Sequence, residues 1–294
     1  MERRAFYKNP VLPWLLLAPQ LLLVLVFFYW PTSQALFWAF TLEQPWGGGN
    51  TWAGFDNFLY IFGDGRYWAT VGRSAFYAIA VSAISMCLAL TLAMFVDRAL
   101  KGTRMFQSVF VWPYAIAAPA AGVAFRFIFA PEAGLIGAVN EMWPGIWNPA
   151  TNGFHALGMV IVCHAWLGIG YNFIFFLAAL QMLPKSLSEA GAMDGAPPYR
   201  RMLDIQLPLI APTVFFLLIM NLISSFTDSF GLIDVMTEGG PINATEVMVY
   251  KLFVDGFKGL DYSGAAAQSI VLMLLVISLT FIQFRWVEKR VHYN

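Results

Sequence analysis

Polar side chains occur at helical spacing within two of the most apolar stretches of this sequence. One stretch, at 154–180, carries His164, Gly168, Tyr171 and Asn172. The next, at 209–232, carries Asn221, Ser224, Ser225 and Asp228 at positions i, i+3, i+4 and i+7, which form one helical face. Polar groups inside such stretches are costly and are functional candidates by default. Their chemistry suits the hydrogen bonding of a polar solute, and Gly168 would let a ligand or another backbone approach closely.

A structural alternative exists for the same residues. Interhelical hydrogen bonds from such groups each contribute about 0.6 kcal/mol to helix packing. For Ser224 and Ser225 taken alone, this alternative is the better one, whereas a bare carboxylate at Asp228 is harder to explain by packing. His164 taken alone favours neither alternative. Two polar faces in consecutive stretches nevertheless predict a solute pathway between them.

Two arginines are candidates for attracting a phosphate group. Arg73 stands at the start of the apolar stretch 73–96, and Arg126 near the end of the apolar stretch 106–129. Both of these ends are predicted below to lie on the outer side of a membrane. Because Arg pairs bidentately with phosphate oxygens, either could attract an anionic phosphate ester. The alternative, which their place near an interface favours, is that both side chains snorkel to the lipid headgroups.

The elements that must position these residues are long apolar helices. Hydrophobic residues make up 59% of the 294 residues and charged residues 12%, whereas a soluble domain has about 25% charged residues. A helix needs about 20 mostly apolar residues to cross a bilayer. Six stretches meet this requirement: 12–40, 73–96, 106–129, 154–180, 209–232 and 262–286. The first is too long for a signal-peptide core, so we expect an all-α polytopic membrane protein with one membrane domain over 1–294.

Basic residues indicate the orientation of these six spans. They are concentrated at both ends and in alternate connections: Arg3, Arg4, Lys8, Arg98, Lys101, Arg104, Lys185, Arg200, Arg201, Arg285, Lys289 and Arg290. The other connections are mainly acidic. Since cytoplasmic loops carry an excess of Lys and Arg, both termini and the connection at about 183–208 are predicted to be cytoplasmic.

This cytoplasmic connection has the signals of two short helices. Ser186 and Glu189 have the spacing of a capping box, which predicts a helix start. Gly195 can adopt the left-handed conformation that ends a helix. The prolines at 197–198 suit the first turn of a second helix, and Pro208 is predicted to open the fifth span. The sequence therefore predicts a helix–turn–helix on the cytoplasmic face.

The same connection resembles the EAA motif of binding-protein-dependent ABC importer permeases. The resemblance rests on Glu189, Ala190, Ala192, Asp194, Gly195 and Ala196, with Leu207 and Pro208 following at the usual distance. Gly191 stands where this family usually has alanine, which we expect to loosen the helix by at most about 1 kcal/mol. The resemblance implies the type I importer permease fold, with this segment as a coupling helix docked on an ATPase subunit. Glu189 and Asp194 would face that subunit, and Gly195 would shape the turn.

The resemblance also implies a location and a set of partners. They are a bacterial inner membrane with its lipid, a homologous second permease, a dimer of ATPase subunits and a periplasmic substrate-binding protein. ATP and Mg²⁺ would bind to the ATPase, with no cofactor on this chain. The sequence fits this expectation because it contains no G-x-x-x-x-G-K-[ST] phosphate-binding motif.

Shorter motifs extend the resemblance over nearly the whole chain. Segments similar to those of carbohydrate-importer permeases lie at 15–19, 54–58 and 239–241. Segments at 171–176, 179–181 and 283–288 look most like the permeases of glycerol-3-phosphate importers. The predicted solute is therefore sn-glycerol-3-phosphate or a glycerophosphodiester. A neutral sugar or oligosaccharide is the alternative, because sugar permeases share most of these motifs.

Other classes of function fit the sequence less well. The net charge is zero, which argues against a nucleic-acid partner. His155, His164 and His292 are scattered along the chain, so no clustered catalytic or metal-binding set is expected and the chain is not predicted to be an enzyme. A secondary carrier, with Asp228 and His164 as a proton relay, is a distant alternative, but such carriers usually show inverted repeats and none is evident here.

Overall fold

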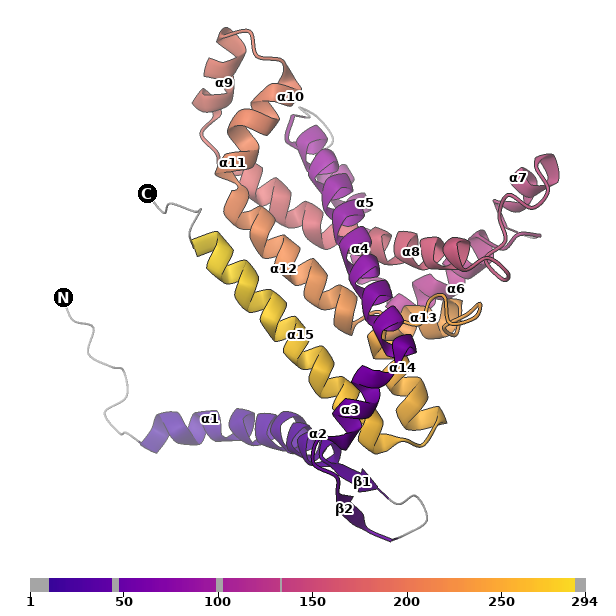
Figure 1. Ribbon diagram of the computed structural model, residues 1–294. Helices are drawn as coiled ribbons and strands as arrows, with labels where there is room; N and C mark the ends of the chain where they lie inside the picture. Colours follow the sequence, from indigo (N-terminus) through magenta and orange to yellow (C-terminus); the bar gives the residue numbers. More distant parts are fainter. Residues whose placement is uncertain (1–10, 44–47, 99–102, 133, 289–294) are drawn as a thin grey trace. The chain divides into compact units, whose positions relative to one another are not determined.

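The structure is a computed structural model that describes residues 11–43, 48–98, 103–132 and 134–288, mostly as helices (Figure 1). Several residues named above lie outside the described residues: Arg3, Arg4, Lys8, Lys101, Lys289, Arg290 and His292. The chain divides into two compact units, one formed by Met1–Asp64 with Leu252–Val271 and the other by Gly65–Lys251 with Leu272–Asn294. The single membrane domain over 1–294 stays a prediction.

A long apolar helix begins the first unit. Its parts are α1 (Val11–Val24), a π-helical turn (Leu25–Tyr29) and α2 (Trp30–Ala39). Together they make a continuous helix of 29 residues, long enough to cross a bilayer, and α1 contains no buried residue. This confirms the helix expected at 12–40.

A small β-hairpin follows this helix, which the expectation of an all-α chain did not include. β1 (Thr41–Glu43) pairs antiparallel with β2 (Asn50–Trp52), and α3 (Asp56–Gly63) comes next. The side-chain amide of Asn57 in α3 donates to the carbonyls of Ala39 at 2.9 Å and Thr41 at 3.0 Å. These bonds join α3 to the end of α2 and to the hairpin. The unit is completed by a second π-helical turn (Val254–Lys258) and the start of α15 (Tyr262–Glu288).

The core of the second unit lies between two long helices, α4 (Gly65–Arg98) and α8 (Gly153–Gln181). Ala89 and Ala93 of α4 are buried together with Phe173 and Phe176 of α8. Small side chains on one helix let the aromatic side chains of the other approach closely. The spans expected at 73–96, 154–180 and 262–286 are confirmed as long apolar helices. Two further short helices, α7 (Gly137–Met142) and α14 (Met248–Phe253), lie in the connections between longer helices.

The third expected span, at 106–129, is not one continuous helix, and its place as a single membrane span stays a prediction. The segment contains α5 (Thr103–Val111), a 3₁₀ turn (Trp112–Ala115) and α6 (Ala118–Ile128), with a bend of 99° at the break. Two prolines account for the interruption. Pro113 lies in the 3₁₀ turn and Pro119 in the first turn of α6, and a proline removes an N–H donor and disfavours helical geometry in the residue before it.

The fifth expected span, at 209–232, is also shorter than predicted. α12 runs over Ala211–Thr227, and a separate helix, α13 (Phe230–Met236), follows it. Pro208 does not open this span, because it lies in α11 (Leu207–Leu209), which meets α12 at a bend of 77°. The described chain thus has four helices that could each cross a membrane, or up to six if each bent pair counts as one span.

The connection at 183–208 is a helix–turn–helix, although its first helix does not start as predicted. α9 (Lys185–Met193) begins before Ser186, with Pro184 at the N-cap position and no side-chain capping bond. The capping box of Ser186 and Glu189 is therefore wrong. Pro184 fixes the boundary because its ring holds φ at −60° while ψ stays extended.

The end of α9 follows the predicted turn chemistry. Gly195 has a φ of +75°, and the N–H groups of Gly195 and Ala196 donate to the carbonyls of Ala192 at 3.1 Å and Gly191 at 3.0 Å. This is a Schellman motif, which satisfies two carbonyls that a helix end otherwise leaves free. The second helix begins as α10 (Pro198–Arg200) and continues through a π-helical segment (Arg201–Gln206) into α11.

Gly191 is buried where α9 crosses this π-helical segment. A Cβ atom there would lie 2.9 Å from Ile205 Cδ1 and 3.3 Å from Arg201 Cγ. The Arg201 guanidinium also donates to the Ser188 carbonyl at 3.1 Å across the same contact. The two arms of the connection are therefore packed as one body.

We expect this close contact to tolerate Gly191→Ala but not Gly191→Leu. Alanine displaces only the flexible end of Ile205 and gains about 1 kcal/mol of helix propensity, whereas leucine overpacks the contact by about 1–3 kcal/mol. The rate of trypsin cleavage after Arg200 and Arg201 in the purified protein measures the separation of the two arms. Equal cleavage of both variants would contradict this assignment of the contact.

Candidate functional site

Seven of the eight residues predicted for a solute pathway line one cavity of about 310 Å³ in the second unit. They are His164, Gly168 and Tyr171 from α8, Asn221, Ser224 and Ser225 from α12, and Asp228 just beyond α12. The remaining wall comes from residues that the sequence did not single out: Val81, Tyr114, Ile116, Ala118, Leu167 and Met220. Three of these, Tyr114, Ile116 and Ala118, stand at the break in the third expected span, which only the fold brings here.

Asn172 is the predicted residue that does not line the cavity. It is completely buried, and its side-chain amide forms a reciprocal pair with that of Asn221. Asn172 Nδ2 donates to Asn221 Oδ1 at 3.0 Å, and Asn221 Nδ2 donates to Asn172 Oδ1 at 2.7 Å. Asn172 therefore holds the orientation of a cavity residue, and the structural alternative describes it better than direct contact with a solute.

Ser85 of α4 joins this amide pair. Its Oγ donates to Asn221 Oδ1 at 3.0 Å and accepts from Asn172 Nδ2 at 3.1 Å. Hydrogen bonds of this kind link helices in an apolar environment, where each polar group needs a partner. The sequence offered only a weak signal for Ser85, because a serine in an apolar stretch has many uses.

His164 is held by a second buried contact. The Tyr77 hydroxyl of α4 lies 2.6 Å from His164 Nδ1, and Tyr77 is completely buried. His164 itself is only 9% exposed and lines the cavity. Because this contact uses Nδ1, a further hydrogen bond from the ring has to involve Nε2. Tyr77 is a second residue that sequence reasoning missed.

Asp228 lines the cavity although α12 ends before it. Its backbone N–H donates to the Ser224 carbonyl at 2.8 Å, and its Oδ1 accepts from Thr227 Oγ1 at 3.0 Å. The predicted helical face is therefore right for Asn221, Ser224 and Ser225, whereas Asp228 reaches the same place from the helix end. Its carboxylate is exposed, which suits a charge at this position.

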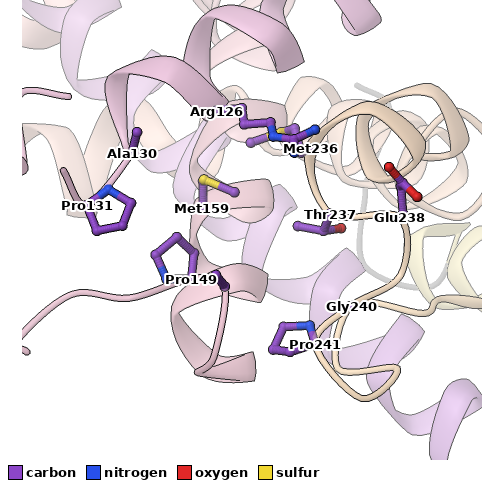
Figure 2. Close-up of a pocket in the computed structure, with 11 residues that line it drawn as sticks. Arg126, Ala130, Pro131, Pro149, Met159, Met236, Thr237, Glu238, Gly240 and Pro241 are labelled. Carbon is purple, nitrogen blue, oxygen red and sulfur yellow. The ribbon is translucent and has the colours of Figure 1, made fainter. Parts of the chain in front are cut away.

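The two arginines predicted for phosphate attraction lie apart from each other. Arg126, at the end of α6, donates to the Val235 carbonyl at 3.1 Å and lines a different cavity of about 300 Å³. Figure 2 shows it beside Met236, with Glu238 on the loop beyond. Arg126 also stands at the C-terminal end of α6, where a positive charge is favourable.

The Arg73 side chain is hydrogen-bonded to another part of the chain. Its guanidinium donates to the Glu246 carbonyl at 2.6 Å. The Glu246 side chain, which is 3% exposed, pairs with Arg66 at 2.9 Å and accepts from Thr70 Oγ1 at 3.3 Å. Arg73 lines neither of the two cavities, so it joins α4 to the segment before α14 and is the weaker candidate for phosphate.

The residues predicted for ATPase coupling lie together at the end of α9 and in the turn after it. Glu189, Ala190, Asp194 and Gly195 are exposed, and Ala196 is half-buried. In Figure 1, α9 and α10 lie beside each other, with α11 between them and the start of α12. The Glu189 and Asp194 side chains both lie at the surface of the described chain.

Among the described residues, no group of three or more His, Cys, Asp or Glu side chains is placed to hold a metal ion. The polar groups that line the cavity between α8 and α12 are hydroxyl, amide, imidazole and carboxylate groups. Such groups can bind and orient a polar solute by hydrogen bonds. The cavity volume is also in the range of small-molecule sites.

Comparison with known proteins identifies the family of the chain. Residues 11–293 match the family described as the binding-protein-dependent transport system inner membrane component. The sn-glycerol-3-phosphate transport system permease protein UgpA of Rhizobium meliloti is 43% identical over 292 residues, covering 99% of this chain and 100% of the relative. The protein of the same name from Yersinia pseudotuberculosis is 45% identical over 282 residues, covering 96% of each.

Solved structures show the same fold. One from a bacterial ABC transporter involved in the import of the acidic polysaccharide alginate superimposes with a TM-score of 0.79 at 22% identity, covering 95% of this chain and 96% of that chain. The matched relatives are named as transport permeases rather than enzymes. Together with the match over residues 11–293, they establish that the chain belongs to the family of inner membrane components of binding-protein-dependent transport systems.

Proposed function

We propose that this chain is a permease subunit of an ATP-driven importer for sn-glycerol-3-phosphate or glycerophosphodiesters. The observation that carries the proposal is the single cavity lined by seven polar or small residues from α8 and the end of α12. Relatives that match nearly the whole chain at 43–45% identity are named for transport of sn-glycerol-3-phosphate. A neutral sugar or oligosaccharide is the alternative solute.

The proposed assembly contains more than this chain. A homologous second permease would complete the pathway, a dimer of ATPase subunits would bind ATP and Mg²⁺, and a periplasmic protein would deliver the solute. The family description and the structure of the alginate transporter in complex with an alginate pentasaccharide-bound periplasmic protein support the last partner. In the membrane, each bent helix pair would count as one span, giving six spans with both termini in the cytoplasm.

The proposed solute contacts are those of the cavity wall. Ser224, Ser225 and Asn221 offer hydroxyl and amide groups on one side, and His164 and Tyr171 offer ring polar groups on the other. A glycerol moiety has hydroxyl groups that both donate and accept hydrogen bonds, so this mixture matches it. Arg126, which lines the separate cavity of Figure 2, would draw an anionic solute toward the protein rather than hold it.

The proposed coupling runs from α9 to the cavity through helical segments that follow one another along the chain, with a bend of 77° between α11 and α12. α9 is packed on the segment Arg201–Gln206 through Gly191 and the bond from Arg201 to Ser188. This segment leads through α11 directly into α12, which carries Asn221, Ser224 and Ser225. Movement of an ATPase against Glu189 and Asp194 would therefore shift the cavity wall.

The solute is tested by uptake into vesicles that contain the complete complex, with sn-glycerol-3-phosphate, a glycerophosphodiester and a disaccharide as ligands. We expect ATP-dependent uptake of the first two. Uptake driven by a proton gradient without ATP would favour a secondary carrier, and uptake of the disaccharide alone would contradict the proposed solute.

The amide pair gives a second prediction. Asn172→Ala leaves the Asn221 amide without its reciprocal partner, at a cost of about 1–3 kcal/mol, so the cavity wall loses its orientation. We expect sn-glycerol-3-phosphate uptake to fall by about tenfold or more while the subunit still assembles. Thr91→Ala is the matched control, because Thr91 bonds only to its own helix on the exposed side of α4. Unchanged uptake by Asn172→Ala would remove the amide pair from the mechanism.

Coupling through α9 gives a third prediction. Reversing the charge in Glu189→Lys should abolish ligand-stimulated ATPase activity of the assembled complex, because the exposed carboxylate would no longer match its partner surface. Glu141→Lys, a charge reversal at an exposed site on α7, is expected to leave this activity unchanged. Full stimulation in Glu189→Lys would show that α9 does not transmit the signal through this residue.

A further inference from the structure

The break in the third span leaves the N-terminal end of α6 without a cap. α6 begins at Ala118, its N-cap residue is Ala117, and no side chain caps it. The first hydrogen bond of the helix runs from Ala121 N–H to Ala117 C=O at 3.1 Å. The N–H groups of Ala118 and Ala120 come before this first bond and have no acceptor within the helix. Pro119, which lies between them, has no N–H group.

An uncapped helix end is unusual inside a membrane-spanning segment. Backbone that departs from a continuous helix is tolerated there only where it is buried in protein or lines a water-filled cavity. Ile116 and Ala118, on either side of the break, line the cavity that also contains His164 and Ser225. The free amides of α6 and the polar residues of α8 and α12 therefore belong to one site.

Ser225 gives independent evidence for a ligand at this place. Its side chain is 2% exposed, and its Oγ has no hydrogen-bond partner among the described residues. A buried hydroxyl without a partner is costly unless a ligand or water completes its bonding. Ser225 lines the same cavity as the uncapped end of α6.

We propose that the uncapped N-terminal end of α6 and Ser225 form the subsite for the phosphate group of the transported solute. A helix N-terminus carries a partial positive charge and free N–H donors, which together bind phosphate without a basic side chain. This inference rests on the proposed function, since it assumes a solute that contains a phosphate group. It assigns one part of the cavity to one part of that solute.

Asp228 determines the orientation of the solute in this arrangement. Its carboxylate lines the same cavity and repels an anion. The phosphate must therefore lie toward α6 and away from Asp228, which leaves the glycerol hydroxyls to donate to the carboxylate. The cavity thus distinguishes the two ends of sn-glycerol-3-phosphate by charge.

The test places a carboxylate at the N-cap of α6. Ala117 is exposed and has the extended conformation of an N-cap residue (φ −61°, ψ 132°), so a larger side chain fits there. Ala117→Asp occupies the free amides and adds a negative charge, whereas Ala117→Asn occupies them without the charge. Uptake of sn-glycerol-3-phosphate is compared with uptake of glycerophosphocholine, a zwitterionic diester whose phosphate has one negative charge fewer above the second phosphate pKa of about 6.

We expect Ala117→Asp to lower the ratio of glycerol-3-phosphate uptake to diester uptake by about tenfold relative to Ala117→Asn. An equal ratio in the two variants would overturn the subsite, whether uptake is normal or reduced in both. Failure of the unmodified complex to take up either phosphate compound would instead overturn the proposed function.

Ser225→Ala provides a second test should the charged variant not assemble. It removes only the unpartnered hydroxyl, and we expect a several-fold loss of glycerol-3-phosphate uptake with normal assembly. Uptake equal to that of the unmodified complex would exclude Ser225 from the phosphate subsite.

Discussion

The pairing of two buried side-chain amides determines how α8 and α12 pack against each other in the second unit. Asn172 and Asn221 each satisfy the other at 2.7 and 3.0 Å, and Ser85 adds α4 to the same point. In apolar surroundings an amide without a partner is costly, so only one register of α8 against α12 satisfies both groups. Every other cavity residue on these two helices takes its position from that register, including His164 and Ser225.

The interrupted helices form part of the cavity wall, and the polar cavity in turn explains why the interruptions are tolerated. The third and fifth spans would be continuous helices if sequence hydrophobicity alone decided, yet one breaks at Ile116–Ala117 and the other ends before Asp228. Both interruptions line the same cavity. In lipid such backbone would be left without hydrogen-bond partners, whereas a polar cavity provides them. The prolines that interrupt the third span are therefore part of how the site is built.

Sequence reasoning predicted the long elements and failed where tertiary contacts decide. α4, α8 and α15 follow from their apolar runs, and Gly195 from the rule that left-handed residues end helices. The break at Pro113 and Pro119 was missed because proline in a membrane helix often produces only a kink. Ser85 and Tyr77 were missed because their partners, Asn221 and His164, are distant in sequence. Seven of the eight proposed pathway residues share a cavity because helical spacing survives folding, whereas Asn172 turned inward to support Asn221.

The same rigidity that fixes the cavity makes the proposed coupling a movement of whole segments. The Schellman motif at Gly195 closes α9, the close contact at Gly191 holds it to the segment Arg201–Gln206, and that segment continues into α12. The exposed carboxylates are linked to Asn221 through these packed segments and the bend of 77° between α11 and α12. In the proposed coupling a displacement at α9 would move α12 relative to α8, and the amide pair would resist such sliding. Opening of the pathway therefore has to preserve this pair by moving α8 and α12 together, or to exchange its hydrogen bonds for bonds to the solute.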